Sequence, residues 1–546
     1  MAETMKERKD MDPQYMWDLS TLFKNDEEWN NALPELDEMI KKLPEYQGKL
    51  NNAKTIREFF DFDTHLGRKL SDFYCYASLR NCEDTRDSDA QAMEAKAYQV
   101  YTAYATAISY AEPEILSLDE DVLESIVHSE DLKPYAFNMQ KLLDQKPHVL
   151  SAKEEALLAA FTETLGAPSK ISESLQDADM TFEPVTDSNG EVHELNQSNY
   201  ILLQMSEDRT LRLNAFKSFY KGFKQHINTF AATYNGCIKE AVAEAQVRHY
   251  ESSRAMSMAY EHVPGVVYDS LVDTVRKFMP EMYRYVRLRK QMLGLDELHY
   301  YDVYTPLIAG SSKSYTYEEA QQMVLDAVTP LGEDYVNRVK QAYKDRWIDV
   351  YPNNGKRGGA FSSGTYDSNP YILTSFTGTL DSVSTIAHEM GHSQHTWLSN
   401  HTQTPQNADY TLFVAEVAST VNENLLVEQL LQKTTEPKER LALLNHYLEG
   451  FKGTVYRQTM FAEFERDAHA MAERGEAITA ASMNTLYKNL IKDYFGEDLV
   501  IDDEVQYEWA RIPHFYRPFY VYKYATSYCA AVALSEAILN NEDGAV

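Results

Sequence analysis

Cysteine is scarce in this chain of 546 residues, which has four. They form no CxxC pair and no metal-finger spacing, so the sequence excludes a disulfide framework and fits a reducing compartment. The N-terminus has no apolar run typical of a signal peptide, and no stretch approaches the roughly 18 to 20 apolar residues of a membrane span. We therefore expect a cytoplasmic protein. The cysteines are Cys75, Cys82, Cys237 and Cys529.

Basic residues are also few, because 52 Lys and Arg stand against 84 Asp and Glu, a formal net charge of −32. Such a charge repels phosphate backbones and anionic lipid headgroups. We therefore expect neither nucleic acid nor a membrane as a partner. The oligomeric state is left open, because no interface pattern stands out.

Glycine and proline are scarce as well, with 21 and 18 residues, and this favours helices over turn-rich all-β architectures. Ser151-Ala152-Lys153-Glu154 is a capping-box pattern that opens an apolar-periodic run, and Gly166 ends that run. Residues 180–195 alternate around Asn189-Gly190, which predicts a β-hairpin. The sequence predicts a mainly α fold with little sheet.

No internal repeat or long low-complexity linker separates independent units. The predicted hairpin is the best divider of the chain. We therefore expect an N-terminal helical domain at 1–200 that ends in the hairpin, and a catalytic domain at 201–546.

The strongest chemical signal is His388-Glu389-Met390-Gly391-His392, which matches HExxH. Histidines at i and i+4 share one helical face and can reach a single zinc ion, and the glutamate projects beside the metal as a general base. Asp381 can cap a helix that begins near Ser382. We therefore expect the motif on a helix and His388 and His392 as metal ligands.

A catalytic zinc site needs a third protein ligand and keeps a fourth position for water. The metzincin pattern fails, because it needs Gly and His where His395 and Leu398 stand. The alternative is a carboxylate from the predicted helix at 411–431, where Glu416 and Glu423 lie seven residues apart on one face. One should bind the metal and the other support it, and the spacing does not decide between them.

The chain resembles the thimet-oligopeptidase-like zinc peptidases, in the oligoendopeptidase F branch, and the resemblance covers nearly all of it. HEMGHSQH, FVAEVAST and the following Asn422-Glu423 carry it. It implies one zinc ion per chain bound by His388, His392 and Glu416, with Glu423 as their support. Further segments in the same order are YMWDLSTLFKNDEEW, SSRAMSMA, YYDVYTPL, GKRGGAFSSG and IPHFYRPFYVYKYATSY.

The resemblance also implies the architecture and the substrates. The expected fold is mainly helical, with two lobes enclosing a deep channel and a small β-sheet beside the HExxH helix. The expected partners are short unfolded peptides. Residues 370–376 predict a strand whose edge could pair with an extended peptide backbone.

His514 precedes a stretch dense in tyrosine, and imidazole or phenol donors can stabilise an oxyanion opposite a metal. Similar peptidases use such a His/Tyr set. The resemblance matches Tyr522 to the transition-state tyrosine, with His514 and Tyr520 as further catalytic candidates. Which tyrosine between 516 and 528 points inward is left open.

The sequence thus predicts a zinc-dependent endopeptidase that hydrolyses internal bonds of short unfolded oligopeptides, with water activated by zinc and Glu389. One alternative is a helical HExxH zinc carboxypeptidase. Another is a non-catalytic, zinc-containing scaffold that binds peptides. Signatures of other enzyme classes are absent, namely GxSxG, the phosphate loop and GxGxxG.

Overall fold

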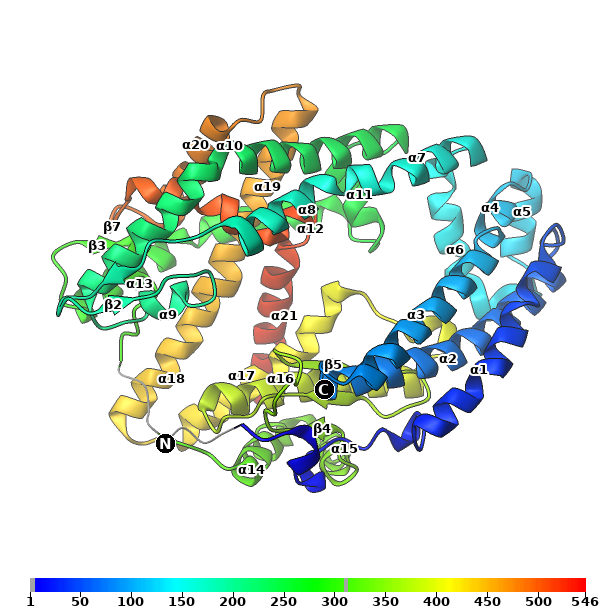
Figure 1. The fold of residues 1–546 in the computed structure, drawn as a ribbon, viewed down its shortest axis with the longest axis horizontal. Coiled ribbons are helices and arrows are strands. Elements are labelled where there is room, and N and C mark those ends of the chain that lie inside the picture. Colours follow the sequence, from blue (N-terminus) through cyan, green and yellow to red (C-terminus); the bar gives the residue numbers. More distant parts are fainter. Residues whose placement is uncertain (1–4, 309–312) are drawn as a thin grey trace. The chain divides into compact units, whose positions relative to one another are not determined.

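The computed structural model describes residues 5–308 and 313–546, except for the side chains of four residues within 152–163. Its contacts divide the chain into two compact units (Figure 1). Unit 1 comprises Met1–Pro147, Ser312–Leu430 and Ala530–Val546, and unit 2 comprises His148–Ser311 and Leu431–Cys529. Each unit is assembled from segments distant in sequence, and the expected domain boundary at residue 200 stays a prediction. The channel implied by the resemblance stays a prediction.

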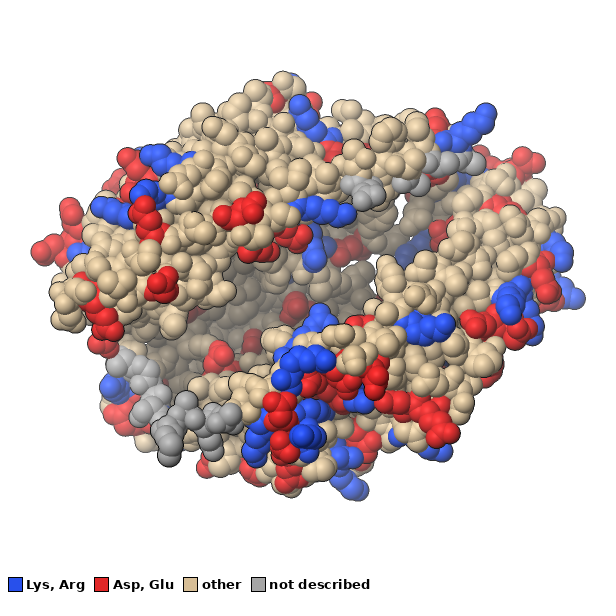
Figure 2. Space-filling view, viewed as in Figure 1, with Lys and Arg blue, Asp and Glu red and all other residues tan. Residues whose placement is uncertain are grey.

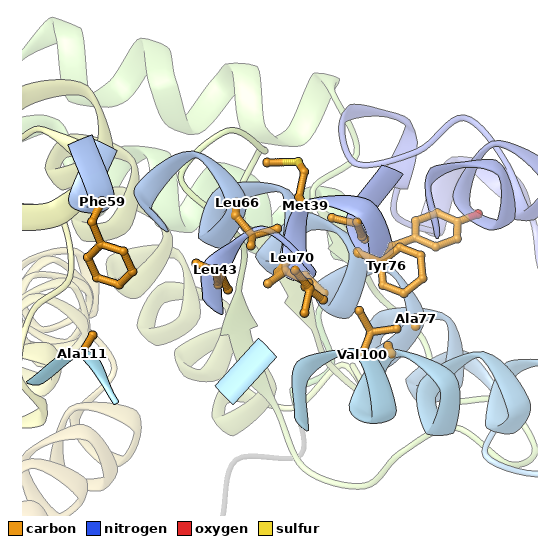
Figure 3. Packing of buried hydrophobic residues seen from close by; sticks show 14 of the residues in the cluster. Met39, Leu43, Phe59, Leu66, Leu70, Tyr76, Ala77, Val100 and Ala111 are labelled. Carbon is orange, nitrogen blue, oxygen red and sulfur yellow. The ribbon is translucent and has the colours of Figure 1, made fainter. Parts of the chain in front are cut away.

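The N-terminal part of unit 1 is helical, and side-chain caps start its three longest helices. Asn25, Asn52 and Asp87 accept hydrogen bonds from backbone N–H groups of the first turns of α1, α2 and α3. Apolar side chains of these helices form one core, in which Trp29 stacks on Phe73 with ring centroids 4.2 Å apart. Figure 3 shows Met39, Leu66, Leu70 and Val100 gathered in this core. The helices are α1 (Asp26–Ile40), α2 (Ala53–Glu83), α3 (Ser88–Ile108), α4 (Ala111–Leu116), α5 (Glu120–Val127) and α6 (Ala136–Gln145).

The second part of unit 1 packs helices on a three-stranded sheet of order β4-β6-β5. Strand β6 (Tyr371–Leu373) is fully buried and central, parallel to β4 (Ile348–Asp349) and antiparallel to β5 (Phe361–Ser363). The predicted strand at 370–376 therefore exists but has no free edge, and β4 and β5 are the edge strands instead. The expectation of a small sheet beside the HExxH helix is confirmed. The helices here are α14 (Tyr317–Ala327), α15 (Glu333–Lys344), α16 (Leu380–Thr402) and α17 (Leu412–Lys433).

Unit 2 is also mainly helical. The predicted capping box is present at the start of α7 (Ala152–Leu165), and the predicted hairpin pairs β1 (Val185–Thr186) with β2 (Val192–His193). A parallel pair joins β3 (Leu298–His299) to β7 (Leu499–Val500). The other helices are α8 (Ala167–Ser174), α9 (Tyr200–Gln204), α10 (Arg209–Val247), α11 (Ser253–Ala259), α12 (Gly265–Lys277), α13 (Met279–Met292), α18 (Pro437–Gly450), α19 (Arg457–Glu473) and α20 (Ala480–Phe495). Helix α21 (Tyr522–Leu539) begins in unit 2 and ends in unit 1.

The surface carries charges of both signs. Figure 2 shows acidic and basic side chains interspersed on the visible face rather than gathered into separate areas. Within the described ranges, no helix is long and apolar enough to cross a membrane.

Candidate metal centre

The HExxH motif lies in the middle of α16, as its sequence predicts. The helix begins at Leu380 and its cap is Thr379, whose Oγ1 accepts a hydrogen bond from the Ser382 backbone N–H at 3.2 Å. The predicted cap, Asp381, is instead an exposed residue of the first turn. Val383 and Ile386 are buried on the core side of α16, so the two histidines project from another side.

Three ligand atoms converge between α16 and α17. His388 Nε2 lies 3.2 Å from His392 Nε2 and 3.4 Å from Glu416 Oε2, and His392 Nε2 lies 3.5 Å from Glu416 Oε2. Ligand atoms about 2.1 Å from one tetrahedrally coordinated ion are about 3.4 Å apart. Two imidazole nitrogens and one carboxylate oxygen in this arrangement therefore fit a single divalent metal ion and leave one coordination position open.

The two acidic residues of α17 occupy different positions around His388. Glu416 faces the Nε2 atoms of both histidines, whereas Glu423 Oε1 lies 3.3 Å from Nδ1 of His388. A carboxylate on the outer nitrogen fixes the tautomer and orientation of a ligating histidine. Hydrogen bonds from His388 and His392 hold the pKa of the Glu416 carboxyl far below its usual value, so this carboxylate stays charged. This geometry distinguishes two roles that the spacing alone leaves open.

The close approach of α16 and α17 depends on Gly391. A Cβ atom at this position would lie 2.6 Å from the Ala418 carbonyl oxygen and 2.6 Å from Ser419 Cα. The buried Asn422 side chain donates to the Ala387 carbonyl at 3.1 Å and ties the same two helices together. Ser419 Oγ donates to Glu416 Oε2 at 3.0 Å and orients that carboxylate. Ser419 is not among the residues predicted from the sequence, although its position three residues after Glu416 is a detectable signal.

Glu389 is buried beside the ligand cluster, with 6% of its surface exposed. Its Oε2 atom has no hydrogen-bond partner within the described part of the chain. Burial raises the pKa of this carboxyl above its ordinary value, which makes it a stronger base than an exposed glutamate. His395 is not part of this cluster, because its ring stacks on Tyr410 with centroids 3.8 Å apart.

In unit 2 the structure brings together three of the predicted aromatic candidates. The rings of His514 and Tyr520 stack with centroids 6.0 Å apart, and Tyr524 lies 5.4 Å from Tyr520. Lys523 Nζ lies 5.4 Å from the centroid of the Tyr520 ring. His514 is exposed and Tyr520 is half-buried, so both rings are accessible to a ligand.

Tyr522 lies apart from this group of rings. Its side chain is 0% exposed and packs against Tyr268 with ring centroids 4.9 Å apart. Burial also raises its pKa. Tyr516 has a structural contact, because its hydroxyl lies 2.7 Å from Thr233 Oγ1. The Tyr522 ring is therefore buried in this structure, whereas His514 is exposed and Tyr520 is half-buried.

The loop that carries Tyr520 is held in an unusual conformation. Phe519 has φ +57°, a left-handed backbone that bulky residues rarely adopt. Its backbone N–H donates to Oε1 of the buried Glu465 at 2.8 Å, and Ser257 Oγ donates to the Pro518 carbonyl at 2.9 Å. The strain persists because these contacts fix the backbone from two sides. No local sequence pattern signals this arrangement.

The chain is similar to families and proteins that are already known. The model of Peptidase family M3 matches residues 202–545, and that of Oligopeptidase F matches residues 114–182. Oligopeptidase PepF of Bacillus subtilis (strain 168) is 43% identical over 100% of this chain and 82% of its own length. Group B oligopeptidase PepB of Streptococcus agalactiae serotype III (strain NEM316) is 41% identical over 98% of this chain and 89% of its own.

A solved structure is also similar. The crystal structure of oligoendopeptidase-F from Enterococcus faecium matches with a TM-score of 0.72 and 36% identity, over 95% of this chain and 89% of that one. Both curated relatives align along nearly the full length of the chain, and the first family model alone spans more than half of it. The chain therefore belongs to peptidase family M3 and is a metallopeptidase of the oligoendopeptidase F type.

Proposed function

We propose that this protein is a zinc-dependent endopeptidase that hydrolyses internal bonds of short unfolded oligopeptides. The observation that carries the proposal is the triangle of His388 Nε2, His392 Nε2 and Glu416 Oε2, with sides of 3.2 to 3.5 Å. Two imidazoles and one carboxylate with an open fourth position are the donor set of catalytic zinc. The names of the relatives, oligopeptidases, support the substrate class.

In this proposal one zinc ion per chain is bound by His388, His392 and Glu416. Bound zinc supplies Lewis-acid chemistry, by polarising a carbonyl and lowering the pKa of water to about 7. Glu423 holds the His388 ring through Nδ1, and Ser419 holds the Glu416 carboxylate. These contacts orient the ligands before the metal binds, which reduces the cost of assembling the site.

Glu389 is the proposed general base. Its Oε2 atom, which lacks a partner among the described residues, accepts a proton from the attacking water and then donates it to the leaving amide nitrogen. The raised pKa of the carboxyl favours both steps, because a base works best when its pKa approaches the working pH. We further propose His514 and Tyr520, rather than Tyr522, as hydrogen-bond donors to the oxyanion.

The unpaired edge of β5 is the proposed site for the peptide backbone. Among the residues that the structure describes, β5 pairs with β6 on one side only, and Ser362 Oγ of β5 lies 2.8 Å from the Oγ atom of Ser393, the residue after His392. An extended peptide can add to such an edge through main-chain hydrogen bonds, which depend little on the side-chain sequence.

We also propose residues 201–546 as the catalytic domain, because all the proposed zinc ligands lie within that range. The proposed location of the protein is the cytoplasm.

The test compares the wild type with Glu389→Gln on a ladder of peptides from about 5 to about 30 residues, together with one folded protein. Product masses identify the cut sites, and metal analysis measures bound zinc. We expect internal cuts in the short peptides and a loss of about 10²- to 10⁴-fold in kcat for Glu389→Gln with zinc retained. Asp381→Asn removes an exposed acid from the same helix and should behave as the wild type.

Two outcomes would replace the proposal. Removal of single C-terminal residues would indicate the carboxypeptidase alternative. Tight peptide binding without cleavage by the zinc-loaded wild type would indicate the scaffold.

A further inference from the structure

Unit 1 contains a large cavity that none of the three proposed metal ligands lines. Its volume is about 1290 Å³, and residues of α2, α3 and α6, together with the segment from Arg357 to Tyr366, line it. Pockets for small molecules occupy roughly 300 to 1,000 Å³. This cavity therefore has room for several residues of a peptide.

Exposed tyrosine rings are the most distinctive feature of its walls. Tyr98 and Tyr101 of α3 are 63% and 52% exposed, and Tyr74 of α2 lies beside Tyr101 with ring centroids 6.3 Å apart. All three line the cavity. Tyr98 and Tyr101 are one helical turn apart, so they present a continuous aromatic surface. We call Tyr74, Tyr98 and Tyr101 the tyrosine strip.

The core of unit 1 does not account for the tyrosine strip. Tyr104, the next residue along the same face of α3, is partly buried against the core, and its hydroxyl donates to Asp63 Oδ1 at 2.8 Å. Tyr98 and Tyr101 lie outside this core and leave large rings in contact with water. Adjacent exposed aromatic side chains in a concave surface are typical of binding sites, where tyrosine is enriched.

The same cavity reaches the proposed peptide site. Phe361, Ser362 and Ser363 of β5 line it, and β5 is the edge strand whose Ser362 contacts Ser393 on the HExxH helix. A peptide that pairs with this edge therefore lies in the cavity, and its continuation passes the other walls. This continuity identifies the occupant of the tyrosine strip as the peptide substrate itself.

One ionic side chain that lines the cavity and one that lies beside it are already engaged. Arg68 donates to Asp367 Oδ2 at 2.8 Å, and Asp72 accepts a hydrogen bond from Thr365 Oγ1 at 2.6 Å. The rings of the tyrosine strip are thus better placed to bind a side chain than these charges are. Aromatic rings bind other aromatic rings by offset stacking or edge-to-face contact.

We propose that the tyrosine strip is a distal subsite that binds an aromatic side chain of the peptide, away from the bond that is cut. This inference rests on the proposed endopeptidase function and adds a sequence preference to it. Backbone pairing along β5 is indifferent to side chains, so the strip supplies selectivity that the edge strand lacks.

The test uses fluorogenic peptides with one cleavable core. The core alone is compared with versions extended at either end by Gly and Ser residues, with or without a single Phe at successive positions. In the wild type, one position of Phe should lower KM. In Tyr98→Ala/Tyr101→Ala, KM for that peptide should rise about tenfold, because each aromatic contact contributes a factor of about 2 to 13. Cleavage of the core, and kcat, should not change.

Two control variants accompany this experiment. Tyr98→Phe/Tyr101→Phe keeps both rings and should retain the preference for Phe. Tyr260→Ala removes a ring that is 55% exposed in unit 2 and outside the cavity, and it should behave as the wild type. Unchanged melting temperatures check that the variants fold.

The proposal is overturned if Phe at no position lowers KM in the wild type, or if the alanine variant keeps the preference. Failure of the wild type to cut the core would refute the proposed function instead. The tyrosine strip is then tested by fluorescence anisotropy, with the same labelled peptides and Glu389→Gln protein with and without the two alanine substitutions. Equal affinities would overturn the subsite, and weaker binding only of the Phe peptide would support it.

Discussion

Replacing Gly391 with alanine tests whether the contact between α16 and α17 sets the metal site. The added Cβ would lie 2.6 Å from the Ala418 carbonyl and from Ser419 Cα, whereas ordinary contact begins at 3.4 Å. Both obstacles belong to the backbone of α17, so that helix must shift by about 0.8 Å. Glu416 lies two residues before Ala418, and its Oε2 moves with the helix. Metal sites tolerate displacements of only about 0.2 Å in ligand distance.

We therefore expect Gly391→Ala to weaken zinc binding at least about 10- to 100-fold, the range found when the groups that support a ligand are lost. Overpacking should also lower the free energy of unfolding by about 1–3 kcal/mol. Competition with a chromophoric chelator measures the zinc affinity, and urea unfolding of the metal-free protein measures the stability.

A matched substitution separates the contact from a general effect of alanine. Gly67 lies within α2, and an added methyl group there would meet nothing within 4 Å, so Gly67→Ala should gain up to about 1 kcal/mol from helix propensity and keep its zinc affinity. If Gly391→Ala binds zinc as tightly as the wild type, the close approach of the helices does not fix Glu416, and the reasoning from the Cβ contact is refuted.

Three further predictions follow from side chains already described. Glu423→Gln should weaken zinc binding about 10- to 100-fold without loss of fold, because it removes the charge at His388 Nδ1; equal affinity by chelator competition would contradict this. Glu465→Leu should speed hydrogen exchange at the Phe519 amide and lower kcat more than it changes KM, while Glu465→Gln keeps the acceptor and should do neither. Burial raises the pKa of Asp72 from 3.8 to about 6. The contribution of the protonated side chain to the free energy of unfolding is therefore fully present below pH about 4 and is lost as the pH rises to about 6. Asp72→Asn should remove this fall and be more stable at pH 7 by about 1 kcal/mol, after allowance for its partial exposure, and parallel pH profiles in urea unfolding would refute the assignment.

The proposed metal ligands could be recognised in the sequence because their geometry is local. Two histidines four residues apart share a helical face wherever the helix lies, and an acidic pair in the next apolar helix is easily recognised. The choice between Glu416 and Glu423 depends on how α16 and α17 pack, and Gly391 sets that packing through a contact with residues far along the chain.

Other features of the fold and the site could not be predicted from the local sequence. Tyr520 and Tyr522 lie only two residues apart, yet Tyr522 is 0% exposed and Tyr520 is half-buried, and the left-handed backbone at Phe519 just before them has no sequence signal. The sequence predicts a strand at 370–376, within which β6 (Tyr371–Leu373) forms, but the central place of β6 in the sheet depends on two partners that no local pattern identifies. Likewise, tyrosines spaced along one face of α3 are compatible with packing in a hydrophobic core, and only the exposure of their rings in the structure shows that they do not pack there.

The assembly of unit 1 from three separate segments affects how the unit folds while the chain is being synthesised. Arg8 donates to both carboxylate oxygens of Asp349, at 2.8 and 2.6 Å, and Tyr371 packs in the core of the N-terminal helices. Ala531 and Ile538 cover Val421 and Leu425 on the helix that carries Glu416. Tyr371 and Leu373 therefore join the core of the first helices late in synthesis, and the proposed metal site forms only after nearly the whole chain has been translated.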